Sequence, residues 1–261
     1  YSHFALPAGQ ACATVGERLE LPSHCALGED SFFPYMEHYG QQGLKEIFKS
    51  IDYLYPNCLR IKSELVLDFE RVFGVHLVEN GVDTRVFCPI SKGDIRVELG
   101  LPVEAKIVIF VGSFIDRKGP LRVLDAIRKL DDVKLICVGS GPQVPEDDRV
   151  LFSGTLQPNM LAKFLNAADI FVLPSKSEGM PNAVLEAMAC NIPIVATDLP
   201  VNIELLNGYP SYELVAADDV KGISLGILSL LNTAKNFSQY DFQYSVRTRV
   251  DKLLDLFDQK L

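Results

Sequence analysis

The chain has 261 residues, of which 48% are hydrophobic and 23% are charged. This composition is typical of a soluble globular protein with one large core or two modest ones, and it does not indicate a disordered chain. The formal net charge of −9 argues against a nucleic-acid surface, and no apolar window is long enough for a membrane-spanning helix. We therefore expect a cytoplasmic protein.

The first 90 residues predict only part of an α/β domain. We expect a strand within 19–27, a helix over 37–55, a strand and then a helix within 58–74, and a strand, an Asn-Gly turn and an extended exit over 76–89. These strands are too few for a complete sheet. Part of the sheet edge and one apolar face are therefore expected to be exposed.

From residue 106 onward, predicted strands and helices alternate. The strands are expected over 106–112, 133–139, 149–154, 169–174, 192–198 and 212–216. The helices are expected over 119–130 and 158–167, after Met180, around 202–206 and over 217–232, and 241–261 has apolar residues at helical spacing. Such alternation predicts a parallel sheet with both faces covered, a complete Rossmann-like domain whose ligands gather at the carboxyl ends of the strands.

The most informative stretch is FVLPSKSEGMPNAVLEAMACNIPIVATD, residues 171–198. It joins a strand, a polar loop and a helix, with Glu178 in the loop and Glu186 about one turn inside the helix. Free N–H groups and the positive end of a helix can face an anion such as a diphosphate, and Glu186 could accept from a ribose diol while Glu178 meets a sugar. The alternative is an ordinary strand-to-helix turn that contains an acidic residue.

With its flanking motifs, the chain resembles the retaining glycosyltransferases of family 4. The resemblance rests on SEGMPNAVLEAMACNIPIVATD, with support from ENGVDTRVF, VGSFIDRKG, VGSGP and SGTL. It implies an α/β fold of GT-B type, with one complete Rossmann-like C-terminal domain and a partial Rossmann-like N-terminal domain. It also implies that the family's first strand and glycine-rich loop have no counterpart here. The implied domains are 1–88 on the acceptor side, 89–240 for the nucleotide sugar, and 241–261 as a helix returning to the first domain.

The resemblance also implies roles for single residues. Glu178 would contact the donor sugar and Lys118 would pair with the diphosphate, which makes these two the candidate catalytic residues. Glu186 would bind the ribose hydroxyls. Pro181 has no N–H to donate, so the amides that face sugar and phosphate are those of Gly179, Met180 and Asn182. Neither a metal nor another cofactor is expected, because charge neutralisation of the leaving nucleotide replaces a metal.

At some positions the chain departs from the family pattern or leaves two interpretations open. Ser113 follows Gly112 where the family has an Arg, and Arg117 either supplies the missing charge or is an ordinary solvated arginine. Gly139 and Gly141 either let the backbone approach the nucleotide or serve a turn with positive φ. On the acceptor side, Asp30 is retained, whereas Leu27 stands where a His or Arg is expected.

The function implied is hexosyl transfer, with retention, from a nucleotide diphosphate sugar such as a UDP- or GDP-sugar to an acceptor hydroxyl, in cell-envelope or exopolysaccharide synthesis. The acceptor is a glycan, a lipid-linked molecule or a small molecule. A position at the inner face of the membrane, peripheral membrane association and an oligomer stay open. The rivals are a nucleotide-sugar-binding or assembly module without turnover and a nucleotide-sugar epimerase; a dinucleotide dehydrogenase is disfavoured because no G-x-G-x-x-G opens a strand–helix unit.

Overall fold

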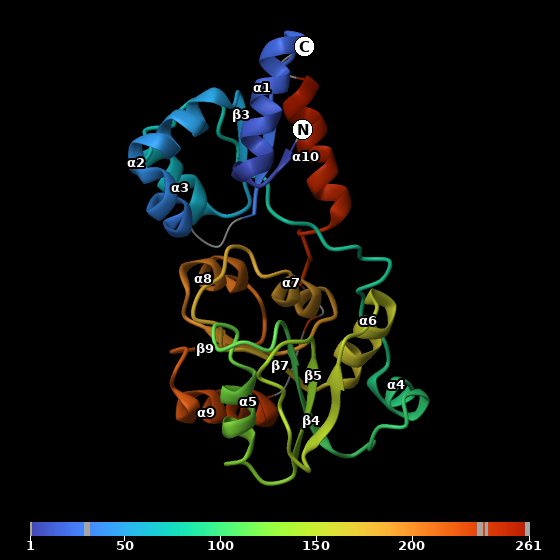
Figure 1. Cartoon of the computed structure of the whole chain (residues 1–261). Coiled ribbons are helices and arrows are strands. Elements are labelled where there is room, and N and C mark those ends of the chain that lie inside the picture. The colour runs from blue at the N-terminus through green and yellow to red at the C-terminus, as the bar shows by residue number, and fades with distance from the viewer. Residues whose placement is uncertain (1, 29–31, 234–236, 238–239, 259–261) are drawn as a thin grey trace. The chain divides into compact units, whose positions relative to one another are not determined.

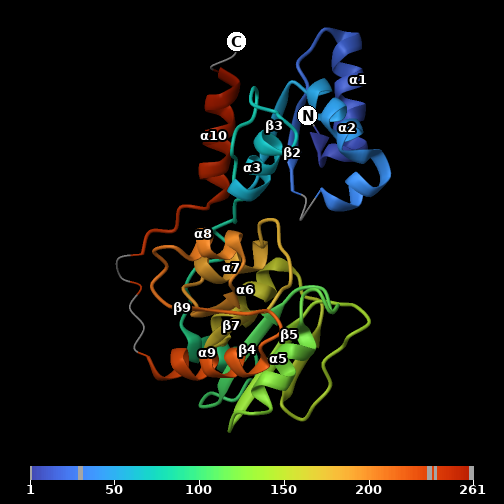
Figure 2. The same cartoon turned by 90° about the vertical axis from the view of Figure 1, so that its left-hand side faces the viewer.

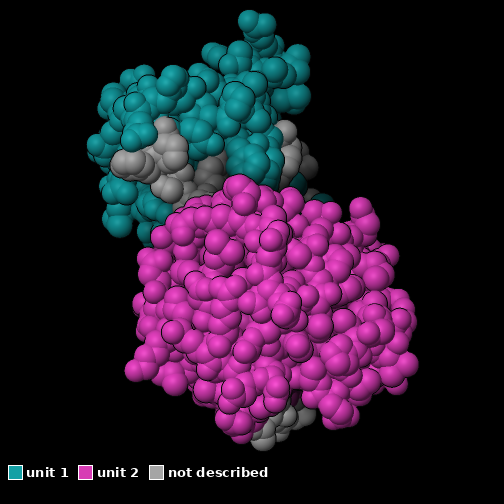
Figure 3. Space-filling model, turned by 60° about the horizontal axis from the view of Figure 1, so that its bottom comes forward, with its two compact units in different colours: residues 1–80, 178–180, 247–261 teal, residues 81–177, 181–246 magenta. Residues whose placement is uncertain are grey.

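The computed structural model describes residues 2–28, 32–233, 237 and 240–258. The contacts between residues divide the chain into two compact units (Figure 3). Unit 1 contains residues 1–80, 178–180 and 247–261, and unit 2 contains residues 81–177 and 181–246. The domain boundaries expected from the sequence, 1–88, 89–240 and 241–261, stay a prediction.

Unit 2 is built on a parallel sheet of six strands in the order β6-β5-β4-β7-β8-β9. The strands are β4 (Lys106–Val111), β5 (Val133–Val138), β6 (Val150–Gly154), β7 (Ile170–Leu173), β8 (Ile194–Thr197) and β9 (Tyr212–Val215). Strands β7 and β8 are buried along their whole length. Continuous apolar strands of this kind need cover on both faces of the sheet, as the sequence predicted.

Helices cover this sheet on both faces. They are α4 (Lys92–Glu98), α5 (Pro120–Ile127), α6 (Pro158–Ala167), α7 (Asn182–Ala189), α8 (Pro200–Leu206) and α9 (Val220–Asn232). Figure 1 shows strands of the sheet between α5 and α9 on one side and α6 on the other. The Ser224 hydroxyl donates to the Ala126 carbonyl at 2.9 Å and fastens α9 to α5. Unit 2 is thus a complete doubly wound domain.

Unit 1 contains a parallel sheet of three strands in the order β1-β2-β3. Its elements are β1 (Ser2–His3), a π-helical turn η1 (Ala5–Gly9), α1 (Gln10–Leu19), β2 (His24–Leu27), α2 (Phe33–Ser50), β3 (Tyr53–Pro56), α3 (Leu59–Leu67) and α10 (Val246–Asp258). In its core, Phe48 lies 5.0 Å from Phe32 and 4.9 Å from Phe69 between ring centroids. Within this unit α10 packs beside the sheet (Figure 2). The ring centroid of Phe257, on α10, lies 4.8 Å from that of His24, on β2.

The structure confirms the α/β class and the partial first sheet, and it corrects three expectations in unit 1. The helix predicted over 37–55 ends at Ser50, and β3 occupies its last residues. Apolar spacing continues past Ser50, but Tyr53–Pro56 pairs with β2, so sheet formation overrides the helical pattern. The strand expected before α3 is therefore absent from its predicted place, because α3 already begins at Leu59.

The strand expected within 76–89 is also irregular. Among the described residues, the bridges at or beside this segment are isolated ones, between Val75 and Leu54 and between Val82 and Ser245. The amides of His76 and Val78 still donate to β3 carbonyls at 2.9 Å. This segment thus extends the first sheet by hydrogen bonds without forming a regular strand. Helices α1 and α4 were not predicted from the sequence.

Candidate functional site

The connection between β7 and α7 carries the strongest sequence signal. It leaves the sheet at the carboxyl end of β7, where parallel sheets bind their ligands. The Thr197 hydroxyl, at the end of β8, donates to the Ser175 carbonyl at 2.7 Å. Asn202 in turn donates to the Thr197 carbonyl at 2.8 Å. The neighbouring strand and α8 therefore hold the start of this loop in place.

Ser175 adds a feature that the sequence did not indicate. Its side chain is fully buried, and its hydroxyl has no hydrogen-bond partner among the described residues. A buried hydroxyl without a partner is costly, and such groups are uncommon in native structures. The carboxyl end of β7 is therefore followed by a buried hydroxyl, that of Ser175, which makes no hydrogen bond to the described residues.

Glu186 is half-buried on the second turn of α7. Burial raises the pKa of its carboxyl from the usual 4.5 to about 7. A partly desolvated carboxylate gains from hydroxyl donors, because they replace the water that it has lost. Its environment is therefore suited to a diol ligand.

Glu178, Gly179 and Met180 lie in the loop before α7 and are buried, with 6% of Glu178 and 7% of Met180 exposed. By their contacts these residues group with unit 1. Within that unit, the backbone amide of Asn80 donates to the Met180 sulfur at 3.1 Å. Asn182, the first residue of α7, is exposed.

The loop between β4 and α5 packs against residues 176 and 177, the start of the β7–α7 loop, within unit 2. The Arg117 guanidinium donates to the Ser177 carbonyl at 2.9 Å, and the Lys176 amide donates to the Arg117 carbonyl at 2.8 Å. Arg117 is therefore half-buried and tied to this loop, so it is not the solvated arginine of the alternative interpretation. Ser113 is exposed, and Lys118 is half-buried near Gly112, where a β-carbon would lie 3.8 Å from Lys118 Cγ.

Arg122 is a residue that the sequence analysis missed. Its guanidinium donates to the carbonyls of Asp116 and Pro174, at 2.7 and 2.9 Å, and pairs with the Asp116 carboxylate at 2.8 Å. Asp116 also pairs with Lys176 at 2.8 Å. The two loops are therefore joined from both sides. An arginine on the first turn of an amphipathic helix gives no sign of this role in the sequence.

Gly139 and Gly141 form the turn after β5, with φ of +151° and +148°. A β-carbon at Gly139 would lie 1.9 Å from the Gly112 carbonyl oxygen, and one at Gly141 would lie 2.5 Å from that of Phe114. The approach of the β4–α5 loop therefore explains both glycines without a ligand. The loops after β4, β5 and β7 fit together at one edge of the sheet.

Two further expectations concern the acceptor side and metals. Asp30 lies outside the described residues. Among residues 2–28, 32–233, 237 and 240–258, no group of three His, Cys, Asp or Glu side chains could hold a metal ion. Over the same part of the chain, no helix has the length and the apolar character required to span a bilayer.

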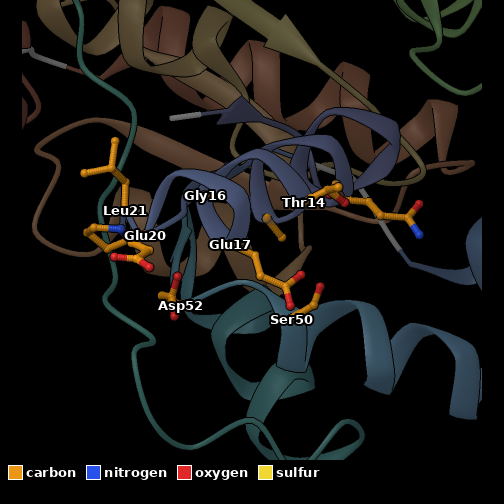
Figure 4. Close-up of a pocket in the computed structure, with 10 residues that line it drawn as sticks. Thr14, Gly16, Glu17, Glu20, Leu21, Ser50 and Asp52 are labelled. Atoms are coloured by element: carbon orange, nitrogen blue, oxygen red, sulfur yellow. The ribbon is translucent and has the colours of Figure 1, made fainter.

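A cavity of about 710 Å³ lies elsewhere, within unit 1 (Figure 4). It is lined by Thr14 and Glu17 of α1, by Glu20, and by Ser50 and Asp52, which precede β3. This is the amino end of the strands, opposite to the end where parallel sheets bind ligands. None of the predicted site residues that the structure describes lines this cavity.

Comparison with known proteins identifies related sequences. The profile described as glycosyl transferases group 1 matches residues 105–233. A Bacillus subtilis protein named as teichuronic acid biosynthesis glycosyltransferase TuaC is 31% identical over 208 residues, which cover 76% of this chain and 52% of that protein. The D-inositol 3-phosphate glycosyltransferase of Mycobacterium marinum is 33% identical over 56% of this chain and 36% of that protein. The chain thus spans about half or less of the length of these relatives.

Solved structures with the same fold are more distant in sequence. Sucrose-phosphate synthase from Thermosynechococcus elongatus superimposes with a TM-score of 0.82 at 21% identity, covering 98% of this chain and 72% of that one. Anabaena HepE in complex with UDP gives a TM-score of 0.80 at 16% identity, covering 96% of this chain and 76% of that one. At these identities the likeness establishes a fold of GT-B type, which confirms the predicted fold class.

Proposed function

The chain belongs to the glycosyl transferases group 1 family, and we propose that it transfers a sugar from a nucleotide diphosphate sugar to an acceptor hydroxyl with retention. The proposal is carried by the β7–α7 connection, where buried Glu178 precedes a helix whose second turn presents the half-buried Glu186. This connection lies at the carboxyl end of a parallel strand. That HepE has been solved with UDP and with UDP-glucose supports a nucleotide sugar as ligand.

Glu186 binds the ribose in this proposal. When ionised, its carboxylate accepts from two adjacent hydroxyls, which replace the water that it loses through the burial that raises its pKa to about 7. The amides of Gly179, Met180 and Asn182 face the sugar and phosphates near the amino end of α7. Glu178 orients the sugar.

Lys118 neutralises the diphosphate that leaves with the nucleotide. Its position beside Gly112 puts a flexible cation at the carboxyl end of β4. Arg117 contributes by holding the Ser177 carbonyl, so its role is to order the β7–α7 loop. Rate enhancement then comes from positioning and from stabilising charge on the departing diphosphate. The leaving phosphate helps to deprotonate the acceptor on the face that it leaves, which retains the configuration.

We base the proposed pathway on the name of one of the relatives reported above. The name of TuaC links that protein to teichuronic acid, a cell-envelope polymer, and we extend this class of pathway to the present chain. The acceptor is then a growing glycan or its carrier.

Calorimetry on the Glu186→Ala and Glu186→Gln variants tests the ribose assignment. A thermal-shift panel of UDP-glucose, UDP-N-acetylglucosamine and GDP-mannose first identifies the donor that raises Tm most. Loss of a hydrogen bond to a charged group should weaken binding of that donor roughly tenfold or more. Unchanged affinity in both variants would discard the role of Glu186.

A second candidate function is a donor-binding module without turnover. It is favoured by the contrast between the six-stranded sheet of unit 2 and the three-stranded sheet of unit 1. Donor-dependent release of nucleoside diphosphate by this chain, measured with a range of acceptors, distinguishes the two. Tight donor binding without any release supports the module.

A further inference from the structure

Asn80 connects the loop before α7 to the C-terminal helix through hydrogen bonds that all lie within unit 1. Its backbone amide donates to the Met180 sulfur at 3.1 Å, and its side-chain Nδ2 donates to the Met180 carbonyl at 3.4 Å. Its Oδ1 accepts from Arg249 Nη1 of α10 at 2.8 Å. The amide can face only one way, because reversing it would put oxygen against the carbonyl and NH₂ against the guanidinium.

The C-terminal helix also holds the residue before Asn80. Lys252 Nζ lies 2.7 Å from the Glu79 carboxylate. Arg249 and Lys252 are three positions apart on a helix and therefore share one face. Residues 79 and 80 are thus fixed at two points by one face of α10. This gives Asn80 a stable platform from which to hold Met180.

Two groups of Met180 are engaged by Asn80, and both affect the backbone of the loop. The carbonyl sets the plane of the peptide bond that enters Pro181, and proline already restricts the residue before it. The sulfur contact fixes the side chain, which is only 7% exposed. Together they hold Met180, and with it the end of the loop that carries the amides of Gly179 and Met180.

We propose that Asn80 and Arg249 are positioning residues for the donor sugar. Arg249 orients the Asn80 amide, and Asn80 holds the 178–180 loop so that its amides and Glu178 meet the sugar. This inference rests on the proposed function and adds to it a residue 100 positions before Met180 and a residue of the last helix. Neither residue contacts the nucleotide in this assignment. Their loss should therefore affect the sugar-dependent part of the affinity.

The test compares a nucleotide sugar with its own nucleoside diphosphate. The donor from the thermal-shift panel and the matching UDP or GDP are titrated by calorimetry into wild type and into Asn80→Ala, Arg249→Ala and Arg249→Lys. Asn80→Ala and Arg249→Ala should raise the Kd of the nucleotide sugar roughly five- to tenfold, as expected for one lost positioning hydrogen bond, and change that of the free diphosphate less than twofold. Arg249→Lys should raise the Kd of the nucleotide sugar less than Arg249→Ala does, because lysine retains a charged donor.

Arg247→Ala is the matched control. Arg247 lies on the same helix with 91% of its side chain exposed, and its ion pair with Asp251 is long, at 3.9 Å. Its loss should change neither Kd. Equal effects of Asn80→Ala on both ligands, or none on either while wild type binds both, overturn the positioning role alone. Failure of wild type to bind any nucleotide sugar in the panel overturns the proposed function and this inference with it.

Discussion

The guanidinium of Arg117 donates to the carbonyl oxygen of Ser177 at 2.9 Å, which fastens the β4–α5 loop to the residue directly before Glu178. A second hydrogen bond joins the same two loops in the opposite direction, from the Lys176 amide to the Arg117 carbonyl. A hydrogen bond from a charged donor to a carbonyl is stronger than a hydrogen bond between two neutral groups. Arg117 therefore sets the entry of the loop that carries the proposed sugar contacts.

Replacing Arg117 with alanine should loosen this loop. We expect the Kd of the nucleotide sugar to rise roughly tenfold, because a hydrogen bond from a charged group contributes about 1.5 kcal/mol or more. Calorimetry measures the change. Arg128→Ala is the control, since Arg128 is an exposed arginine paired with Asp125 and Asp147. Equal behaviour of the two variants would contradict a role for Arg117 in the site.

Lys118→Ala should weaken ligands in proportion to their phosphate charge. If its ammonium meets the diphosphate, the Kd of UDP or GDP should rise roughly tenfold, whereas that of the uncharged nucleoside should stay unchanged. The loss should diminish at high salt. Lys129→Ala, at an exposed lysine just beyond α5, provides the control. An equal loss for the diphosphate and the nucleoside would remove Lys118 from the phosphate site.

The sequence predicted the fold of unit 2 well because its central strands β7 and β8 are apolar on both faces and its strands and helices alternate regularly. The helix expected over 158–167 is α6 at Pro158–Ala167, and every expected strand from residue 106 onward is present. In unit 1, by contrast, β3 forms where helical spacing continues. Pairing with β2 decided that element, and a local pattern does not reveal such pairing.

The site was predictable where a residue's place in the chain fixes its place in the fold. The loops after β4, β5 and β7 carry Lys118, Gly139 and Glu178, and the parallel order of the strands puts these ends at one edge. The contacts that join segments distant in sequence were not predictable. Arg122 reaches Pro174 across 52 positions, and Asn80 reaches Met180 across 100. The ligand roles themselves stay predictions.

Asp169 should be a major determinant of the stability of unit 2. Its carboxylate accepts from Arg96, which is 2% exposed, from Lys92 and from the Ile107 amide. Burial pushes the pKa of Asp169 upward, but the hydrogen bonds from Lys92 and Ile107 and the two cations bring it below the usual value. Asp169→Ala leaves the Arg96 charge buried without its partner.

We expect Asp169→Ala to cost about 3–5 kcal/mol, which lowers Tm by on the order of 10 °C. Thermal unfolding followed by circular dichroism measures the shift. Asp125→Ala removes an exposed acid that pairs with Arg128, and it should shift Tm by less than about 2 °C. Similar shifts in the two variants would show that the buried network contributes no more than a surface pair.

Glu186 should make the ligand-free protein less stable as pH rises. Its pKa is about 7 in the folded chain and near 4.5 when exposed, so between these values the folded state binds more protons than the unfolded state. The stability associated with the protonated carboxyl is complete below pH 4.5 and is lost as pH rises through 7. Glu186→Gln keeps the side chain neutral, and its Tm should exceed that of wild type by a growing margin from pH 5 to pH 8.

The difference between the two Tm curves isolates Glu186, because every other side chain is the same in both proteins. The affinity for the donor should instead increase as pH rises, since the ionised carboxylate is the better acceptor for ribose hydroxyls. In wild type, the gain in affinity for the nucleoside with rising pH should be centred near 7, and in Glu186→Gln it should be absent. Parallel Tm curves together with a pH-dependent affinity in Glu186→Gln would show that another group titrates in the site.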